Sequence, residues 1–345
     1  FVVDGAGHKM SKSKGNVVAP QKVMDTYGAD ILRLWTASTD YSGELTISDE
    51  ILKRVAESYR RIRNTMKFLL ANIADFDASK DLLPVDQWLG IDRYALHLTT
   101  QLQEDIATKK DADGNDVSYY GKYEFHLAVQ KFVSFCSEDL GGFYLDILKD
   151  RLYTAGENSP ARRAAQSALY HITHCMMRLM APILSFTADE IWHALNLDTE
   201  RTVFEEAWYE LPSFDMISVE IGNIHTARIV RTLAQKEIEK FREVGSVGSS
   251  LQAELEFYFT EESAIYRSLN SLGEDLKFVM ITSDATVYKA ATTDSEKIVV
   301  RPSAHKKCDR CWHYRADVGS DTEHPHICGR CVSNLFGRGE RRTHA

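Results

Sequence analysis

Apolar residues repeat with the period of an α-helix through the middle of the chain, and this pattern most constrains the fold. Ser48 predicts the N-cap of the first long helix, with Asp49 and Glu50 in its first turn. After this cap, apolar residues follow one another in steps of three and four, so they share one helix face. They are Ile51, Val55, Tyr59, Ile62, Met66, Leu69 and Ile73.

The same period returns in four later segments, which predict further amphipathic helices near residues 91–106, 123–136, 160–179 and 187–195. Ser159-Pro160 predicts the start of the third segment, and Thr187-x-x-Glu190 has the pattern of a capping box for the fourth. Helices with modest connections bury their apolar faces against one another. We therefore expect a mostly α fold with a helix bundle over about 48–196, in a domain that extends to residue 211.

The segments on either side of the bundle differ from it. Before it, a polar loop precedes a helix over 21–27, with Pro20 in the first turn and Gly28 at the C-terminal cap. After it, a helix is expected over 217–244 and another over 261–272. Apolar residues alternate from Leu251 to Phe259, and residues 278–282, 286–290 and 297–301 are rich in β-formers. These patterns predict a small α+β unit over 212–302.

Composition excludes several classes of protein. With 345 residues, 44% of them hydrophobic and 26% charged, the chain is typical of two or three folded domains rather than a disordered protein. The longest apolar stretch, 176–186, is interrupted by Arg178 and Pro182, so no membrane span is expected. No signal peptide opens the chain, and its first residue, Phe1, predicts a fragment or a processed chain. A net charge of −9 argues against a generally basic nucleic-acid binder but leaves room for basic patches.

Four of the six cysteines form two pairs with the spacing of a zinc site, Cys308-x₂-Cys311 and Cys328-x₂-Cys331. Two such knuckles converge on one tetrahedral zinc ion, and without a secretion signal zinc is favoured over disulfides. The histidines nearby, His313, His324 and His326, are alternative ligands. The other two cysteines, Cys136 and Cys175, lie in apolar helical patterns and are expected to be buried.

The opening loop gathers cations and hydroxyls in a short run, His8-Lys9-Met10-Ser11-Lys12-Ser13-Lys14-Gly15-Asn16. Lysines and serines of this kind bind phosphate, and Gly15 and Asn16 allow a tight fold. By composition alone, however, a solvated basic loop is the simpler interpretation. A second polar run, residues 111–116, resembles a calcium-binding loop at first sight. The positions where that loop requires Gly and Glu hold other residues here, so the run predicts a turn.

The string Lys9-Met10-Ser11-Lys12-Ser13 resembles the second signature of class I aminoacyl-tRNA synthetases. Its continuation through 14–16, 28–35 and 38–41 resembles the bacterial-type isoleucyl-tRNA synthetases in particular. The resemblance continues at 61–65, 68–72, 143–146 and 181–190, and it ends in the cysteine segment at 308–313 and 327–331. It therefore covers essentially the whole chain.

The resemblance implies a reaction and roles for the loop. In this family the loop binds ATP phosphates while isoleucine is activated to isoleucyl-adenylate, which is then transferred to tRNA(Ile). Carried over, Lys12 is the first candidate for stabilising the leaving pyrophosphate and Lys9 the second. Met10, Ser11 and Ser13 complete the ATP-binding loop, and magnesium accompanies ATP.

Candidate tRNA contacts lie on the first bundle helix and in the cysteine segment. The resemblance implies that the bundle binds the anticodon. Residues 53–67 hold six lysines and arginines against one acid, Glu57, a pattern that suits phosphate contacts but is also that of a solvated helix face. In the cysteine segment the Trp312 ring lies beside arginines in the sequence, an arrangement that suits stacking on an unpaired RNA base. Packing of Trp312 within the small domain is an equally good interpretation. The candidates are Lys53, Arg54, Arg60, Arg61, Lys67, Arg310, Trp312 and Arg330.

The resemblance also predicts the division of the chain and what it lacks. We expect a catalytic-domain remnant over 1–47, the anticodon-binding bundle over 48–211, the α+β unit over 212–302 and a zinc ribbon over 303–345. The family's first signature, His-x-Gly-His, has no match in these residues, so the chain alone is expected to be inactive. A cytoplasmic monomer is expected. The alternatives are a non-catalytic zinc-ribbon RNA-binding module and a valine- or leucine-type synthetase.

Overall fold

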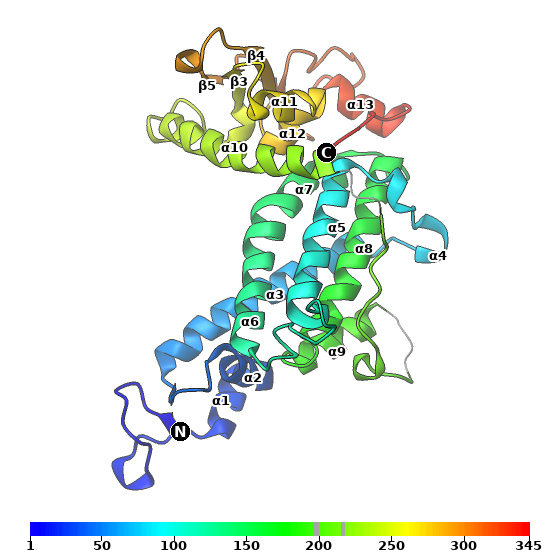
Figure 1. Cartoon of the computed structure of the whole chain (residues 1–345). Helices are drawn as coiled ribbons and strands as arrows, with labels where there is room; N and C mark the ends of the chain where they lie inside the picture. The colour runs from blue at the N-terminus through cyan, green and yellow to red at the C-terminus, as the bar shows by residue number, and fades with distance from the viewer. Residues whose placement is uncertain (196–199, 215–217) are drawn as a thin grey trace. The chain divides into compact units, whose positions relative to one another are not determined.

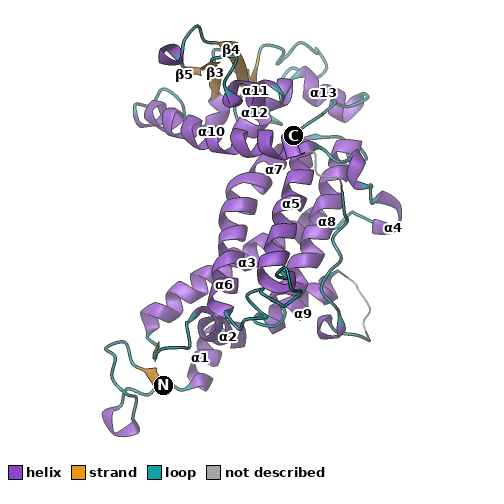
Figure 2. Ribbon diagram, in the orientation of Figure 1, coloured by secondary structure: helices purple, strands orange, loops and turns teal. Residues whose placement is uncertain are grey.

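A computed structural model describes residues 1–195, 200–214 and 218–345, and its internal contacts divide the chain into two compact units. Unit 1 comprises Phe1–Asp75, Leu96–Gly142 and Leu169–Pro212, and unit 2 comprises Phe76–Ala95, Phe143–Ala168 and Ser213–Ala345. Helices make up most of both units (Figure 2). No helix in the described part of the chain is long and apolar enough to cross a membrane.

Unit 1 is built on helices whose ends follow the sequence signals (Figure 1). Helix α1 (Pro20–Tyr27) has its proline in the first turn, and Gly28, with φ 91°, closes it through an N–H bond to Met24. Helix α3 (Asp49–Asn72) is capped by Ser48, whose side chain accepts from the Ile51 N–H. Along α3 the predicted face is buried from Val55 onward except at Tyr59, which is half-buried, and Leu52 rather than Ile51 is buried in the first turn. The remaining regular elements are α2 (Ala29–Ser38), α6 (Phe125–Ser134), α9 (Ser185–Ala194) and the short parallel strands β1 (Val2–Val3) and β2 (Leu45–Thr46).

The N-terminus of α9 is capped from another helix, so the predicted capping box is wrong. Helix α9 begins at Ser185, which places Thr187 and Glu190 inside it rather than at its cap and third position. The carboxylate of Asp30, on α2, accepts from the Phe186 N–H at 3.2 Å, and from the Thr187 N–H at 2.7 Å and hydroxyl at 2.6 Å. A buried carboxylate therefore satisfies the free N–H groups of this helix end.

Two predicted helices continue in π-helical geometry. Helix α5 (Gly90–Gln103) is followed by a π-helical turn at Glu104–Thr108, and α6 is followed by a longer π-helical stretch, Phe135–Tyr144. A Cβ on Gly141 would lie 2.9 Å from the carbonyl oxygen of Cys136, five residues earlier, so glycine suits the wider helix there. Cys136 and Cys175 are buried as predicted. The run 111–116 is a turn, with Gly114 at φ 84°.

Unit 2 contains the predicted α+β elements. Helix α10 (Ser218–Glu243) confirms the helix expected over 217–244, whose first residue, Ile217, lies outside the described residues. Strand β3 (Ala253–Phe259) pairs in parallel with β4 (Asp284–Lys289) and antiparallel with β5 (Lys297–Pro302). Its residues alternate strictly between buried and half-buried, as the sequence predicted. Helix α7 (Leu145–Thr154), α11 (Ala264–Asn270) and the short α4 (Ala78–Asp81) also belong to this unit, and α8 (Pro160–Met180) contributes residues to both units.

The strand predicted over 278–282 is instead a helix, α12 (Leu276–Met280). A short apolar run does not distinguish a strand from a buried helix by its period alone. Here the 3₁₀ turn Gly273–Asp275 starts the helical path, and Ile281, with φ 56°, ends it. Four of its five residues are buried, which explains why the segment is mostly apolar.

One buried and one half-buried histidine of α8, His174 and His171, make the stability of unit 1 depend on pH. Burial lowers the pKa of His171 to about 4, and burial together with the Arg178 charge lowers that of His174 to about 3. Both rings are neutral in the folded chain and protonate below about pH 6.5 in the unfolded chain. Their contribution is complete above pH 6.5 and declines as the pH falls toward 4. We expect a loss of about 1–2 kcal/mol per histidine between pH 7 and pH 5.

Urea unfolding at both pH values measures this loss, with His174→Gln as the comparison. Glutamine keeps a polar group beside Arg178, whose Nη1 lies 3.1 Å from the His174 Nδ1, but it does not titrate. The variant should lose less stability than the parent between pH 7 and pH 5. An equal loss in both proteins would contradict the assignment to His174.

Candidate phosphate-binding loop and zinc site

The opening loop is held closed by Asp4 and Asn16. The Asp4 carboxylate accepts from the backbone N–H of Ala6 at 3.0 Å and of His8 at 2.8 Å. The Asn16 amide donates to the Asp4 Oδ2 at 2.8 Å, and its oxygen accepts from the Ser11 N–H at 2.9 Å. Hydrogen bonds from Asn16 and the His8 backbone lower the pKa of Asp4 below its ordinary value. These contacts join the start and the end of the loop across twelve residues.

Within this frame, residues Lys12–Lys14 form a single 3₁₀ turn. Ser11 caps it by accepting from the Lys14 N–H at 3.3 Å, and its hydroxyl lies 3.2 Å from that of Ser13. Gly15, with φ 67°, closes the turn through an N–H bond to the Lys12 carbonyl, as its sequence position predicted. The two hydroxyls therefore contribute to the shape of the turn.

The lysines of the loop point to solvent. Lys9, Lys12 and Lys14 are all exposed, and none forms an ion pair within the described ranges of the chain. Met10 is half-buried, and its sulfur lies 3.5 Å from the Val18 nitrogen. Three uncompensated cations on one closed loop are suited to a multiply charged anion.

Asp4 and Asn16 are residues that sequence reasoning missed. Asn16 was expected to help through its backbone, but its side chain makes the contacts. A signal was present, because Asp before Gly and Asn after Gly are both residues that bond nearby backbone groups. The twelve-residue separation of the pair hid the connection between them.

The four paired cysteines come together in the C-terminal segment. Their sulfurs lie within 4.8 Å of one another, and all four residues are buried. The Sγ atoms of Cys308 and Cys331 are 3.8 Å apart, and those of Cys311 and Cys328 are 3.7 Å apart. Two sulfurs bound tetrahedrally at about 2.3 Å from one zinc ion lie about 3.8 Å apart. The donor set therefore fits one zinc ion.

The local structure explains how the knuckles form. The hairpin of β6 (Lys306–Lys307) and β7 (Tyr314–Arg315) carries the first, and the second opens α13 (Gly329–Phe336). The Cys328 N–H donates to the Cys308 sulfur at 3.3 Å. Within this cluster, hydrogen bonds from the Cys311 and Cys331 thiols lower the pKa of Cys328, and contacts with Cys311 and Cys328 raise the pKa of Cys331.

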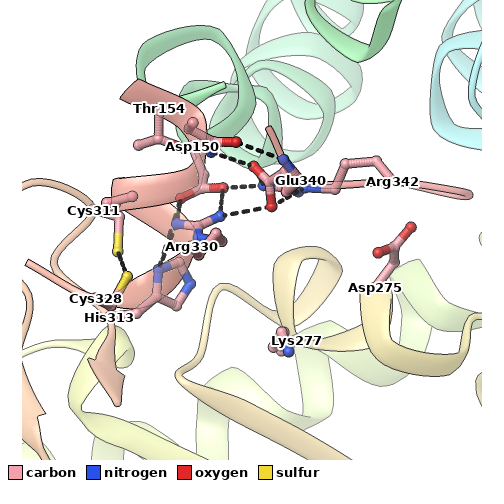
Figure 3. Close-up of polar contacts among 12 residues, drawn as sticks. Asp150, Thr154, Asp275, Lys277, Cys311, His313, Cys328, Arg330, Glu340 and Arg342 are labelled. Atoms are coloured by element: carbon pink, nitrogen blue, oxygen red, sulfur yellow. Dashed lines mark hydrogen bonds and ion pairs between the residues drawn. The ribbon is translucent and has the colours of Figure 1, made fainter. Parts of the chain in front are cut away.

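The alternative histidine ligands do not belong to the metal-binding group of the described residues. The His313 Nδ1 lies 3.7 Å from the Asp150 Oδ1 and 3.5 Å from the Arg330 Nη2, so this ring faces an ion-pair cluster (Figure 3). The His324 ring stacks on Phe336, with 4.2 Å between ring centroids. Among the described residues, the group that qualifies as a metal site contains the four cysteines and no histidine.

Comparisons with known proteins match the segments that carry the loop and the four cysteines. Residues 1–48 match the family model of tRNA synthetases class I (I, L, M and V), residues 117–257 match the anticodon-binding domain of tRNA ligase, and residues 306–334 match the zinc finger found in FPG and IleRS. Isoleucine–tRNA ligases of Thiobacillus denitrificans and Dechloromonas aromatica are 59% and 57% identical over 100% and 99% of the chain. The chain belongs to the isoleucine–tRNA ligase family. It spans about a third, 35%, of the length of each of these two ligases.

Family membership and the cysteine geometry together establish the character of the C-terminal segment. The match to the zinc finger found in FPG and IleRS spans all four cysteines, and the described structure brings their sulfurs to zinc-binding distances. The segment therefore holds structural zinc.

The predicted tRNA contacts on α3 fall into two groups. All five, Lys53, Arg54, Arg60, Arg61 and Lys67, are exposed. Arg54 pairs with Glu50 at 3.0 Å, and Arg60 pairs with Glu57. The other three form no ion pair with any residue that the structure describes. Their charges are the more available to a phosphate backbone.

The predicted contacts in the zinc segment differ from one another. Trp312 is 59% exposed, at φ 63°, with the Lys307 ammonium 5.3 Å from its ring, so it is not packed into the core of the segment. Arg310 donates to the end of α7. Arg330 is buried, and its guanidinium pairs with Asp150, a placement that does not suit a tRNA contact.

Proposed function

We propose that this chain supplies the ATP-phosphate loop and the tRNA-binding region of an isoleucine–tRNA ligase. The observation that carries this proposal is the loop held closed by Asp4 and Asn16, with three exposed, unpaired lysines, Lys9, Lys12 and Lys14. A module that only binds RNA has no need of such a turn. The family match over residues 1–48 supports the same assignment.

In the proposed reaction, the carboxylate of isoleucine attacks the α-phosphate of ATP. A bond forms between carboxylate oxygen and phosphorus, and the bond to the β-phosphate oxygen breaks, releasing pyrophosphate with its magnesium. Lys12, at the start of the turn, stabilises the charge that develops on this leaving group, and Lys9 supports it. Ser11 and Ser13 hold the turn that presents the lysines. The tRNA(Ile) terminal hydroxyl then attacks the carbonyl carbon of the adenylate and releases AMP.

The proposed roles follow the four segments that the sequence predicts. Residues 1–47 carry the loop, 48–211 the anticodon-binding bundle, 212–302 the α+β unit and 303–345 the zinc ribbon, with Cys308, Cys311, Cys328 and Cys331 as the zinc ligands. The ligase is proposed to act as a monomer in the cytoplasm. The chain alone is proposed to be inactive, because its residues contain no His-x-Gly-His signature.

We propose that the unpaired cations of α3 contact the tRNA backbone. Replacing Arg61 and Lys67 by glutamine should weaken tRNA(Ile) binding and lower the slope of log affinity against log salt by roughly one to two. The matched control replaces Arg54 and Arg60, whose charges are already paired on the same helix. Filter binding between 50 and 200 mM salt measures both pairs. Equal slopes for the parent and the Arg61/Lys67 variant would contradict this surface.

A further inference from the structure

Each zinc knuckle carries an arginine at the same position. The first reads Cys308-Asp309-Arg310-Cys311 and the second Cys328-Gly329-Arg330-Cys331. In both, the arginine directly precedes the second cysteine. A zinc ion that binds all four sulfurs therefore fixes the backbone on both sides of each arginine.

The first of these arginines caps helix α7. The Arg310 guanidinium donates to the backbone carbonyls of Thr154 at 2.6 Å and Tyr153 at 3.4 Å. These residues form the end of α7. The last carbonyls of a helix have no partner within it and carry partial negative charge, so a guanidinium there satisfies both needs.

The second arginine, Arg330, contacts α7 one turn before its end. The two Nη atoms of Arg330 donate to the two carboxylate oxygens of Asp150 at 2.7 and 2.8 Å (Figure 3). Only 7% of the Arg330 side chain is exposed, and Arg342 pairs with the same carboxylate. Burial alone would raise the pKa of Asp150, but the hydrogen bond from Arg330 and the charges of Arg330, Arg342 and His313 hold it below its ordinary value.

The zinc segment has a very small buried core. Its buried cluster consists of the four cysteines, with only Val318 and Ile327 packed against it in the described structure. A cluster this small does not fix backbone positions without the metal. The positions of Arg310 and Arg330 therefore depend on the zinc site.

We propose that Arg310 and Arg330 form a two-point clamp on α7, and that bound zinc keeps this clamp engaged. Arg310 holds the carbonyl end of the helix, and Arg330 holds its last acidic side chain. The metal then has an effect outside its own segment, because occupancy of the four thiolates governs the order of the last turns of α7. This inference concerns the chain's own coupling and does not depend on the proposed reaction.

Hydrogen–deuterium exchange of the α7 amides, followed by mass spectrometry on the zinc-loaded chain, tests the clamp. Arg310→Gln should speed exchange in the last turn of α7 at least about tenfold, the effect of losing a hydrogen bond from a charged donor. Metal analysis should still find one zinc per chain. Removing zinc with a chelator should speed the same amides by at least as much.

The matched control is Arg315→Gln. Arg315 belongs to the same segment, but its guanidinium pairs locally with Asp317 at 2.9 and 3.2 Å. It should leave α7 unchanged. The proposal is overturned if chelation speeds exchange only within the zinc segment, if Arg310→Gln leaves α7 protected, or if Arg315→Gln matches Arg310→Gln. Arg310 is only half-buried, so Arg310→Gln is expected to fold. It therefore tests the clamp even if replacing the buried Arg330 by glutamine prevents folding.

Discussion

Replacing Lys12 by alanine in a complete isoleucine–tRNA ligase that contains this chain should lower isoleucine-dependent ATP–pyrophosphate exchange by roughly 100-fold or more. The loss follows from the position of Lys12 on a turn fixed by Ser11 and Gly15, with its charge uncompensated. Removing one fixed group that stabilises charge in a transition state costs about 10²–10³ in rate. Binding of tRNA(Ile) should change little, because Lys12 acts on the phosphates of ATP.

Lys14→Ala is the matched control for this result. Lys14 is exposed on the same turn, so the control tests whether position rather than local charge matters. We expect its exchange rate to fall less than about tenfold, since it loses only a general attraction for phosphate. Equal losses for Lys12 and Lys14, or a Lys12 defect confined to tRNA affinity, would contradict the assigned role.

Replacing Cys308 by serine should remove zinc and unfold the C-terminal segment from about residue 306 to 336. Structural zinc contributes roughly 10 kcal/mol or more to the folding of small zinc modules. The four cysteines are themselves the buried cluster of the segment, with only Val318 and Ile327 packed against them among the described residues. Metal analysis and limited proteolysis of the segment measure both effects.

Cys175→Ser provides the comparison for the zinc variant. Cys175 is equally buried, but it lies on α8, and its thiol contacts the Gln103 side chain at 3.0 Å. It should keep one zinc per chain whatever its effect on stability. Full zinc retention by Cys308→Ser would mean that another residue completes the site, and it would contradict the four-cysteine assignment.

Local sequence signals predicted the elements that depend on neighbouring residues. Ser48 caps α3, Pro20 begins α1 and Gly15 closes the loop turn, as their types require. The alternation in β3 matched its burial, and the spacing of the cysteines matched their convergence. In each case the physical cause lies within a few residues or in a strict repeat.

Contacts between distant residues could not be predicted in this way. Asp30 caps a helix that begins 155 residues later. Asp92 and Arg151 form a buried ion pair, and the Tyr144 hydroxyl donates to the Asp92 carboxylate at 2.8 Å. Arg330 was predicted to contact tRNA from its charge alone. Its burial against Asp150 depends on tertiary packing, which the sequence pattern does not show. Charge in a sequence indicates chemistry, but only the fold shows which charges remain available.

A chimeric ligase tests the central claim most directly. In it, this chain replaces the aligned segment of the Thiobacillus denitrificans isoleucine–tRNA ligase, with which it is 59% identical. The measurement is charging of tRNA(Ile) with isoleucine, with the Lys12→Ala chimera as control. We predict that the chimera charges tRNA(Ile) and that the control loses at least about 100-fold of this activity. A folded, zinc-loaded chimera that fails to charge tRNA(Ile), or a control as active as the chimera, would contradict the claim.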